Sequence, residues 1–335
     1  MSASPVEAPE VTVVIPARNE AAFIGPCLES VLRQSFDRMQ VVVVDGASSD
    51  DTVAIVSSFQ ASDARVELLQ NHRSIIPASL NQALAAARGR WFIRIDAHAT
   101  VPTDYVATLV RHLESGRWGG VGGRKDGIGL TTQGKAVALA MSSPFGVGNS
   151  AYHYATSPQE VDHIPFGAYP VELARRLGGW DERLVVNQDF EFDFRVRRAG
   201  YKLPLDPTLV VDWHCQQSIS ALCRQYLRYG RGKAHVARMH PASLRARHLA
   251  APALLASWAA AILLAVGGRR RTAIAVVTPY AVAVLGASTW TGRHAPTFAV
   301  ARHLPGAFLA MHVGWALGFW RGIWGMGASA RGQRR

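Results

Sequence analysis

The chain has 335 residues, of which 49% are hydrophobic and 18% charged, and its formal net charge at pH 7 is +12. This length suits one large domain with an appended segment, and the positive charge favours anionic partners: nucleic acids, anionic lipids or phosphorylated substrates. The absence of zinc-finger and helix-turn-helix spacings, and of aromatic residues alternating with basic ones, argues against a nucleic-acid-binding protein. Because much of the basic excess follows Arg224, near apolar segments, we favour a membrane surface.

The N-terminus and the cysteines indicate the compartment. Residues 1–10 lack a basic stretch followed by an apolar one, so we predict a disordered N-terminus and no signal peptide. Cys27, Cys215 and Cys223 show no C-x-x-C spacing. We therefore expect reduced thiols in a domain on the cytoplasmic side.

Short apolar segments alternate with amphipathic ones over the first hundred residues, which is typical of βαβ units. The pattern predicts an α/β fold with a mostly parallel sheet flanked by helices. Ligands of such sheets bind beyond the carboxyl ends of the strands, so polar residues that follow the strands are candidate site residues. The predicted strands are 11–15, 40–45, 65–69 and 91–95, and the predicted helices are 21–34, one from 51, and 79–87.

The remaining sequence divides by composition. A glycine-rich stretch begins at 116, and we predict a charged helix at 187–198, a strand at 203–214 and a basic amphipathic helix at 218–235. The expected organisation is a disordered N-terminus (1–10), an α/β domain (11–217), a basic juxtamembrane helix (218–247), a membrane region with about three apolar helices (248–326) and a basic tail (327–335).

Three apolar segments, at 249–266, 272–290 and 304–324, are each long enough to cross a membrane, since roughly 17–25 residues suffice. The alternative is a set of buried helices in a soluble all-α domain. Three full spans would place Arg269–Arg271 outside, so the distribution of positive charge sets no clean orientation. One segment could therefore be interfacial or re-entrant.

The sequence Trp91-Phe-Ile-Arg-Ile-Asp96-Ala-His98 runs from an apolar strand into an acidic residue and a histidine. Residues i and i+2 of an extended segment point to the same side, so Asp96 and His98 can face one ligand. A carboxylate with an imidazole suits Mn²⁺ or Mg²⁺, which could hold a diphosphate. His214, after a later strand, is a possible third ligand or a packed residue beside Trp213. The alternative for Asp96-Ala-His98 is a solvent-facing turn.

Two other strand ends carry polar residues. Asn19 and Glu20 follow the first strand and could contact a nucleoside. The alternative is that they form an ordinary polar turn. Asp45 ends the second strand, where a carboxylate can accept hydrogen bonds from a base or a ribose. The alternative role, capping the next helix, can be filled by one of the residues 49–51. No G-x-G-x-x-G follows the first strand, which excludes a dinucleotide-binding motif there.

Asn187-Gln-Asp-Phe-Glu-Phe-Asp193 places carboxylates four residues apart on one face of a predicted helix. Asp189 lies near the helix N-terminus, where the helix dipole favours its ionised form. This suits a general base that takes a proton from a hydroxyl. The alternative is a solvated acidic face paired with Arg195 and Arg197.

Gln225-Tyr-Leu-Arg228-Tyr229 lies on the basic amphipathic helix before the apolar segments. Arg228 could reach a leaving diphosphate, and Tyr229 could stack on a sugar ring. A juxtamembrane helix that meets lipid phosphates is the alternative, and both can hold.

Taken together and in this order, these stretches over residues 10–235 resemble the family-2 glycosyltransferases, whose nucleotide-diphosphate-sugar-binding fold is of the GT-A type. V-V-I-P-A-R-N-E (13–20) and V-D-G-A-S-S-D-D-T (44–52) are similar to the family's two nucleotide-binding stretches. Asp96-Ala-His98 stands where members usually have Asp-x-Asp, and Gln188-Asp189 where many have Glu-Asp. Q-Y-L-R-Y (225–229) is similar to the Q-x-x-R-W motif of processive synthases. The whole most resembles the succinoglycan-type membrane glucosyltransferases.

The resemblance implies roles for single residues. Glu20 and Asp45 would contact the base and ribose, Asp96 and His98 would bind the metal with His214, and Asp189 would be the catalytic base. Arg228 would stabilise the leaving diphosphate. The donor-binding set would comprise Pro16, Ala17, Arg18, Glu20, Asp45, Arg73, Asp96, Gln225 and Tyr229.

The resemblance also implies an inverting transfer that depends on Mn²⁺ or Mg²⁺. The donor would be a nucleotide-diphosphate sugar, with a UDP-sugar favoured, and the acceptor a lipid-linked sugar or polysaccharide at the cytoplasmic face of the inner or plasma membrane. The product would serve exopolysaccharide or cell-envelope glycan synthesis. A processive polysaccharide synthase and a non-catalytic, membrane-anchored scaffold that binds nucleotide sugars are the alternatives.

Overall fold

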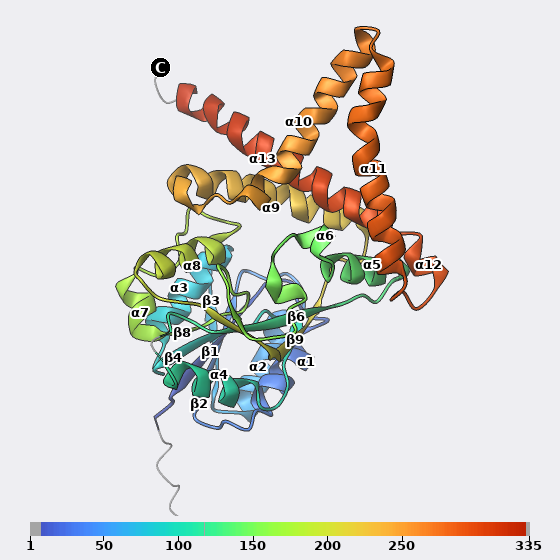
Figure 1. Ribbon diagram of the computed structural model, residues 1–335. Helices are drawn as coiled ribbons and strands as arrows, with labels where there is room; N and C mark the ends of the chain where they lie inside the picture. The colour runs from blue at the N-terminus through green and yellow to red at the C-terminus, as the bar shows by residue number, and fades with distance from the viewer. Residues whose placement is uncertain (1–7, 117, 333–335) are drawn as a thin grey trace, which may run out of the picture. The chain divides into compact units, whose positions relative to one another are not determined.

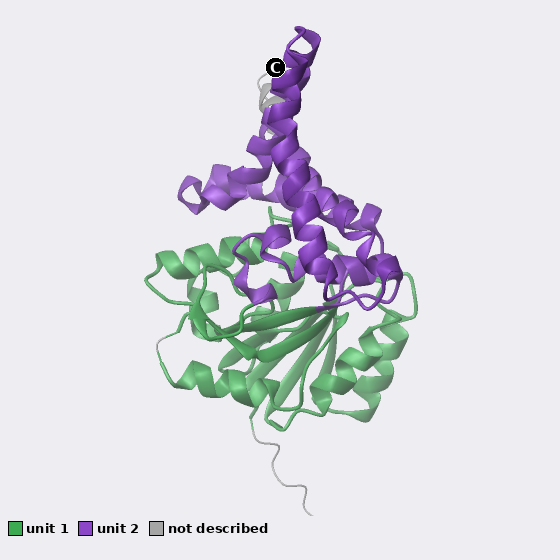
Figure 2. Cartoon of the chain, turned by 45° about the vertical axis from the view of Figure 1, so that its right-hand side comes forward, with its two compact units in different colours: residues 1–126, 155–213 green, residues 127–154, 214–335 purple. Residues whose placement is uncertain are grey.

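The computed structural model describes residues 8–116 and 118–332, the last seven of them for their backbone only (Figure 1). Most of the expected disordered N-terminus, and the end of the expected basic tail, lie outside these residues. Two compact units make up the chain (Figure 2): residues 1–126 with 155–213, and residues 127–154 with 214–335. The segment 127–154, which the sequence suggested belongs to the α/β domain, therefore groups with the C-terminal helices.

The first unit is built on a five-stranded sheet in the order β3-β2-β1-β4-β8. Its first four strands in the chain are parallel, and β8 runs antiparallel to β4. This confirms the predicted α/β class with a mostly parallel sheet. The elements are β1 (Val11–Ala17), α1 (Ile24–Leu32), β2 (Met39–Asp45), α2 (Thr52–Ser62), β3 (Val66–Gln70), α3 (Ile76–Ala86), β4 (Trp91–Arg94) and β8 (Ala168–Pro170).

Helices cover both faces of this sheet. The chain moves from β1 outward to β3 and then returns to the other side of β1 as β4, and right-handed crossovers place helices on opposite faces when the direction reverses. Accordingly, α1 and α2 lie on one side and α3 on the other (Figure 1). β2 is buried throughout and β1 nearly so, which explains their continuous β-branched sequences. The aromatic core on the α3 side includes Phe92, Trp180 and Phe192.

A second sheet, in the order β5-β9-β6, completes the first unit, and β7 also pairs with β9. A bridge between Val121 and Ala168 connects β8 to the chain just before β6. The remaining elements are β5 (Ala99–Thr100), α4 (Tyr105–Glu114), β6 (Gly122–Ile128), β7 (Gln159–Glu160), α7 (Val171–Arg176), α8 (Gln188–Arg198) and β9 (Pro204–His214).

The second unit is helical. Its most extensive packing is between α9 and α13, and α10 pairs with α11 as a hairpin. Its elements are α5 (Thr132–Met141), α6 (Pro144–Val147), η1 (Ala151–His153), α9 (Ile219–Met239), η2 (Pro241–Ser243), α10 (Ala246–Val266), α11 (Arg270–Gly292), α12 (Phe298–Ala301) and α13 (Leu304–Gly332).

Glycines allow α13 to approach α9 at backbone distance. Gly314, Gly318 and Gly322 recur every four residues and therefore lie on one face of α13. A Cβ built on Gly318 would stand 2.0 Å from the carbonyl oxygen of Leu227 on α9. Small residues at this spacing permit close helix packing. The expected apolar segment at 304–324 is thus a helix packed along α9.

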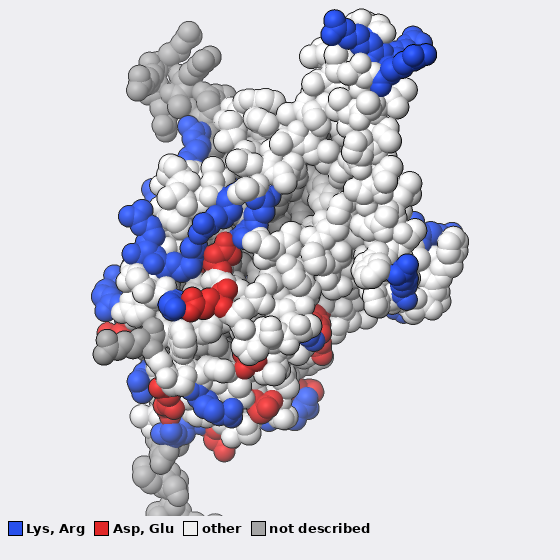
Figure 3. All heavy atoms as spheres, viewed as in Figure 1, with Lys and Arg blue, Asp and Glu red and all other residues white. Residues whose placement is uncertain are grey.

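Two helices of the described residues, α10 and α11, are long and apolar enough to cross a membrane. Both are mostly unburied, and they expose large apolar side chains such as Ile262, Leu263 and Leu285. Figure 3 shows few charged atoms along this hairpin below its tip, where basic atoms gather; the sequence there is Arg269–Arg271. Of the three apolar segments that the sequence suggested, two, in α10 and α11, are therefore candidate membrane spans.

Candidate active site

The carboxyl ends of β1 and β4 meet where the order of the first sheet reverses. β1 pairs with β2 on one side and β4 on the other, and open α/β sheets bind ligands at such a reversal. Glu20 follows β1 and His98 follows β4, with His98 Nδ1 3.0 Å from the Glu20 carboxylate. Burial alone would lower the pKa of His98, but the hydrogen bond to Glu20 and the charge of Asp96 raise it.

The two predicted nucleotide-binding loops are bonded to each other. Asn19 adopts a left-handed conformation with φ of 55°, which asparagine tolerates better than most residues. Its Oδ1 accepts the Ser49 N–H at 2.8 Å, and its own N–H donates to Ser48 Oγ at 2.9 Å. The Glu20 N–H donates to Thr52 Oγ1 at 2.8 Å. The residues after β1 and β2 therefore form one rigid edge.

Asp45 and Asp50, both near the end of β2, have different hydrogen-bond partners. Asp50 accepts the N–H and the O–H of Thr52, at 3.1 and 2.5 Å, at the start of α2. A residue of the 49–51 stretch thus serves the helix start, as the sequence suggested. Asp45 is 1% exposed and accepts the Ser48 N–H at 3.1 Å. Its contact with a nucleotide stays a prediction.

Arg94, the last residue of β4, is a buried cation between two carboxylates. Its Nε donates to Asp96 Oδ1 at 2.8 Å, and its Nη1 lies 3.7 Å from Asp189 Oδ2. Burial alone would lower the pKa of Arg94, but the charges of Asp96 and Asp189 raise it. One guanidinium therefore brings the predicted metal-binding carboxylate and the predicted base into the same cluster.

Asp189 occupies the first turn of α8, as predicted. Its Oδ1 accepts the Phe190 N–H at 2.8 Å, and its Oδ2 lies 4.0 Å from His163 Nε2. Burial would raise the pKa of Asp189, yet the charges of His163 and Arg94 outweigh it and lower the pKa. The carboxylate is therefore ionised at neutral pH and can accept a proton.

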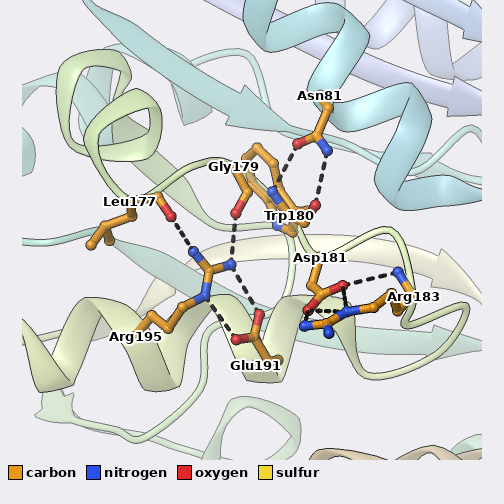
Figure 4. Close-up of polar contacts among 8 residues, drawn as sticks. All are labelled: Asn81, Leu177, Gly179, Trp180, Asp181, Arg183, Glu191 and Arg195. Atoms are coloured by element: carbon orange, nitrogen blue, oxygen red, sulfur yellow. Dashed lines mark hydrogen bonds and ion pairs between the residues drawn. The ribbon is translucent and has the colours of Figure 1, made fainter. Parts of the chain in front are cut away.

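The loop before α8 is held by a second guanidinium (Figure 4). Arg195 on α8 pairs with buried Glu191 at 2.7 and 2.9 Å. Its other donors reach the carbonyl oxygens of Leu177 and Gly179 at 2.5 and 2.6 Å. Trp180 lies on the same loop, and the side chain of Asn81 on α3 hydrogen-bonds both its N–H and its carbonyl oxygen. These contacts fix the chain that leads into Asp189.

Lys125 on β6 adds a further cation to this side of the unit. Its Nζ lies 3.8 Å from the ring centroid of Trp213, whose ring is 5.8 Å from that of His98. The charge of Lys125 contributes to the lowered pKa of Asp189. Lys125 and Trp213 are therefore near neighbours of the predicted metal-binding and catalytic residues.

The other predicted donor-binding residues of the first unit lie on its loops. Arg73 pairs with Glu182 of the loop before α8. The Arg18 side chain is exposed and lies 3.5 Å from the Ser74 carbonyl oxygen. Pro16 and Ala17 are the last residues of β1. Their contacts with a donor stay predictions.

The predicted residues of the second unit differ in exposure. On α9, Gln225 is 5% exposed and its buried Oε1 has no hydrogen bond within the described residues. Arg228 is exposed, and Tyr229 is half-buried with its ring 5.7 Å from that of Tyr226. His214 also belongs to this unit. The roles of these residues stay predictions.

Asp96 and His98 supply a carboxylate and an imidazole from one loop, and both side chains are partly exposed. This donor pair suits Mn²⁺ or Mg²⁺. Within residues 8–116 and 118–332, no three His, Cys, Asp or Glu side chains gather as a metal-binding group. A small divalent ion is commonly held by one or two carboxylates together with substrate phosphates and water, so the pair fits an ion that binds with its substrate.

Sequence reasoning missed Arg94, Lys125, His163 and Asp193. Arg94 stands within an apolar strand, where a single arginine has no periodic signal. Lys125 and His163 lie in turn-rich stretches. Their positions became informative only once β8 was paired with β4, and β6 and α8 were placed in the same unit. The one usable signal was the spacing of Asp189 and Asp193 on α8.

Comparisons with known proteins show the family to which the chain belongs. The family model described as "Glycosyl transferase family 2" matches residues 12–175. The chain is 32% identical over 330 residues to the succinoglycan biosynthesis protein ExoA of Rhizobium meliloti, covering 96% of this chain and 97% of that protein. These matches and the fold define a glycosyltransferase with a GT-A fold. The chain belongs to glycosyltransferase family 2, which confirms the predicted family.

Two more distant similarities extend the comparison. A dolichyl N-acetyl-α-D-glucosaminyl phosphate 3-β-D-2,3-diacetamido-2,3-dideoxy-β-D-glucuronosyltransferase of Methanococcus voltae is 24% identical over 233 residues, covering 67% of this chain and 72% of that protein. The mannosyltransferase PcManGT of Pyrobaculum calidifontis, solved with GDP-Man and Mn²⁺, has a TM-score of 0.63 at 22% identity. The match covers 97% of this chain and 90% of that structure. It supports the GT-A fold.

Proposed function

We propose that this glycosyltransferase transfers a sugar, with inversion, from a nucleotide-diphosphate donor to a lipid-linked or polysaccharide acceptor in exopolysaccharide synthesis. The observation that carries the proposal is the contact of one buried guanidinium, Arg94, with both Asp96 and Asp189. It puts a carboxylate suited to the donor's metal and a carboxylate suited to proton abstraction within one cluster. The relative named for succinoglycan biosynthesis supports the pathway class, and a UDP-sugar is the favoured donor.

In the proposed reaction, the acceptor hydroxyl oxygen bonds to the anomeric carbon of the donor sugar. The bond from that carbon to the diphosphate oxygen breaks on the opposite side, and the electron pair leaves with the nucleoside diphosphate. The hydroxyl proton passes to Asp189. A single displacement of this kind inverts the anomeric configuration.

Asp96 and His98 would hold the divalent ion, which when bound supplies positive charge against the departing diphosphate. Arg94 holds the Asp96 and Asp189 carboxylates in place, and its charge helps to keep Asp189 ionised. Glu20 and Asp45, on the bonded loop edge, would orient the nucleoside. Positioned groups of this kind lower the barrier because their orientation is set before the reaction begins.

The charge distribution supports a membrane location. The second unit contains 17 Lys and Arg residues and no Asp or Glu, whereas the first contains 19 and 24, respectively. On α9 the exposed residues Arg224, Arg228, Arg231 and Arg238 recur on one face. Clustered arginines beside apolar helices suit anionic lipid headgroups. We therefore propose that α9 lies at the cytoplasmic surface of the membrane and that α10 and α11 enter it.

The experiment is a donor screen with the full chain in detergent. Thermal stabilisation by UDP-glucose, UDP-galactose, UDP-N-acetylglucosamine and GDP-mannose is measured with and without Mn²⁺, and the best donor is offered with polyprenyl-diphosphate-linked sugars. NMR of the product then gives its anomeric configuration. We expect Mn²⁺-dependent stabilisation and a product of inverted configuration. Retention would contradict the mechanism, and donor binding without transfer or hydrolysis would favour the scaffold.

A processive synthase is the second candidate, favoured by Gln225, Arg228 and Tyr229 on α9. The product length decides between the two. A single added sugar supports the proposal, whereas a distribution of long products supports the synthase.

A further inference from the structure

His163 lies between two carboxylates of α8 that the sequence places one helical turn apart. Its Nδ1 is 2.7 Å from Asp193 Oδ2, and its Nε2 is 4.0 Å from Asp189 Oδ2. Because residues i and i+4 share a helix face, one imidazole can face both carboxylates. The two ring nitrogens therefore face different partners, and the orientation of the ring is defined.

Asp193 is the fixed end of this arrangement. It is 0% exposed and accepts three hydrogen bonds: from His163, from the Ile164 N–H at 2.9 Å and from the Tyr169 hydroxyl at 2.8 Å. Tyr169 is itself packed edge-on against Phe192, with the ring centroids 5.0 Å apart. A carboxylate anchored by so many donors holds the imidazole in one orientation, in the way that second partners orient catalytic histidines.

We infer that His163 is a positioning residue for Asp189: anchored by Asp193, its imidazolium keeps the Asp189 carboxylate ionised and oriented to receive the acceptor's proton. This inference rests on the proposed role of Asp189 as the base. It assigns control over the pH range in which the enzyme works to Asp193 together with His163, which lies outside every motif of the sequence.

The charged groups that face Asp189 and His163 determine in which direction the pKa of Asp189 moves when His163 is replaced. Asp189 is also approached by Arg94 from β4 and Lys125 from β6, both cationic. His163 is also near Asp162, and it shares the Asp193 carboxylate with the neutral hydroxyl of Tyr169. Burial would lower the pKa of His163, but Asp193 and Asp189 raise it. Removing the imidazolium takes one cation from Asp189 and leaves two, so the pKa of Asp189 rises without returning to that of an isolated buried carboxyl.

The test is the pH profile of donor hydrolysis, with water as the acceptor, for the full chain with Mn²⁺ and the UDP-sugar that stabilises it most. In His163→Gln the acidic limb of kcat/KM should move to higher pH by about one unit or more, while KM for the donor at the plateau changes little. His163→Lys, which restores a cation, should return the limb toward the wild-type position. His112→Gln breaks another His–Asp contact of the same unit, His112 to Asp206 at 2.6 Å, and should leave the limb unmoved.

Three outcomes contradict the inference. The first is an unmoved acidic limb in His163→Gln, and the second is the same pH profile for the Gln and Lys variants. The third is that neither His163→Gln nor a second neutral variant, His163→Asn, folds, which would assign His163 to stability alone. Asp189→Asn separates the two proposals: if it stays active, the proposed base itself is wrong, whereas if it is inactive and the limb is unmoved, only the role of His163 fails.

Discussion

The carboxylates of Asp96 and Asp189 contact the same buried guanidinium, that of Arg94, although 93 positions separate them in the sequence. Asp96 follows β4 of the first sheet, and Asp189 opens α8. A fork of fixed donors can bind two carboxylates at once and hold the spacing between them. That spacing is what a transfer between a metal-held donor and a deprotonated acceptor requires.

Replacing Arg94 with lysine should separate the effect of its positive charge from the effect of its contacts with both carboxylates. A lysine keeps the charge but cannot contact both carboxylates with the same geometry. We expect kcat/KM to fall roughly 10- to 100-fold, which corresponds to one or two lost hydrogen bonds to charged groups. Arg90→Lys is the control, because Arg90 is exposed and its salt bridge to Glu114 is long, at 3.9 Å. Equal activity of both variants would remove Arg94 from the site.

Chelation tests the metal-binding residues. EDTA should abolish donor binding, measured as thermal stabilisation by the UDP-sugar, and added Mn²⁺ should restore it. Asp96→Ala should show the same loss but without rescue by Mn²⁺, since the ligand itself is gone. Activity that survives chelation would mean that Asp96 and His98 serve another purpose.

Arg228 has two possible partners, a leaving diphosphate and a lipid phosphate, and nanodiscs of defined composition separate them. If Arg228 stabilises the diphosphate, Arg228→Gln should lower kcat about 100-fold or more in neutral and in anionic nanodiscs alike. Arg224→Gln, on the same exposed face of α9, should lower activity only slightly. A loss seen for Arg228→Gln in anionic nanodiscs alone would assign this arginine to lipid.

The α9–α13 contact depends on the absence of a side chain at Gly318. Gly318→Ala would place a Cβ 2.0 Å from the Leu227 carbonyl oxygen, so the helices must separate. We expect a loss of about 1–3 kcal/mol in the free energy of unfolding, measured as a lowered Tm in detergent. Gly325→Ala is the control on the same helix, because nothing lies within 4 Å of its Cβ position and alanine favours the helix. An unchanged Tm for Gly318→Ala would contradict the close packing.

Local sequence patterns predicted four of the five strands of the first sheet, and most clearly β1 and β2, which are buried on both faces and therefore form continuous β-branched segments. The three-residue strand β8 was not predicted. The polar residues at the carboxyl ends of the predicted strands could be assigned to one edge because parallel strands meet there. The role of Arg94 could not be predicted, since its importance comes from α8, which is distant in the sequence. The role of His163 could not be predicted either, because its contacts with Asp189 and Asp193 depend on where α8 lies in the fold. The pairing of α9 with α13 depends on glycines some 90 residues from their contacts, and no local pattern encodes that distance.

The proposed mechanism requires Asp189 to take the acceptor's proton, and Asp189→Asn removes this base while keeping the shape of the side chain. We expect turnover to fall about 100- to 10,000-fold, with Mn²⁺-dependent binding of the UDP-sugar within a few-fold of wild type. Asp104→Asn, at an exposed carboxylate of the same unit, should retain full activity. Turnover near the wild-type rate in Asp189→Asn would show that Asp189 is not the base.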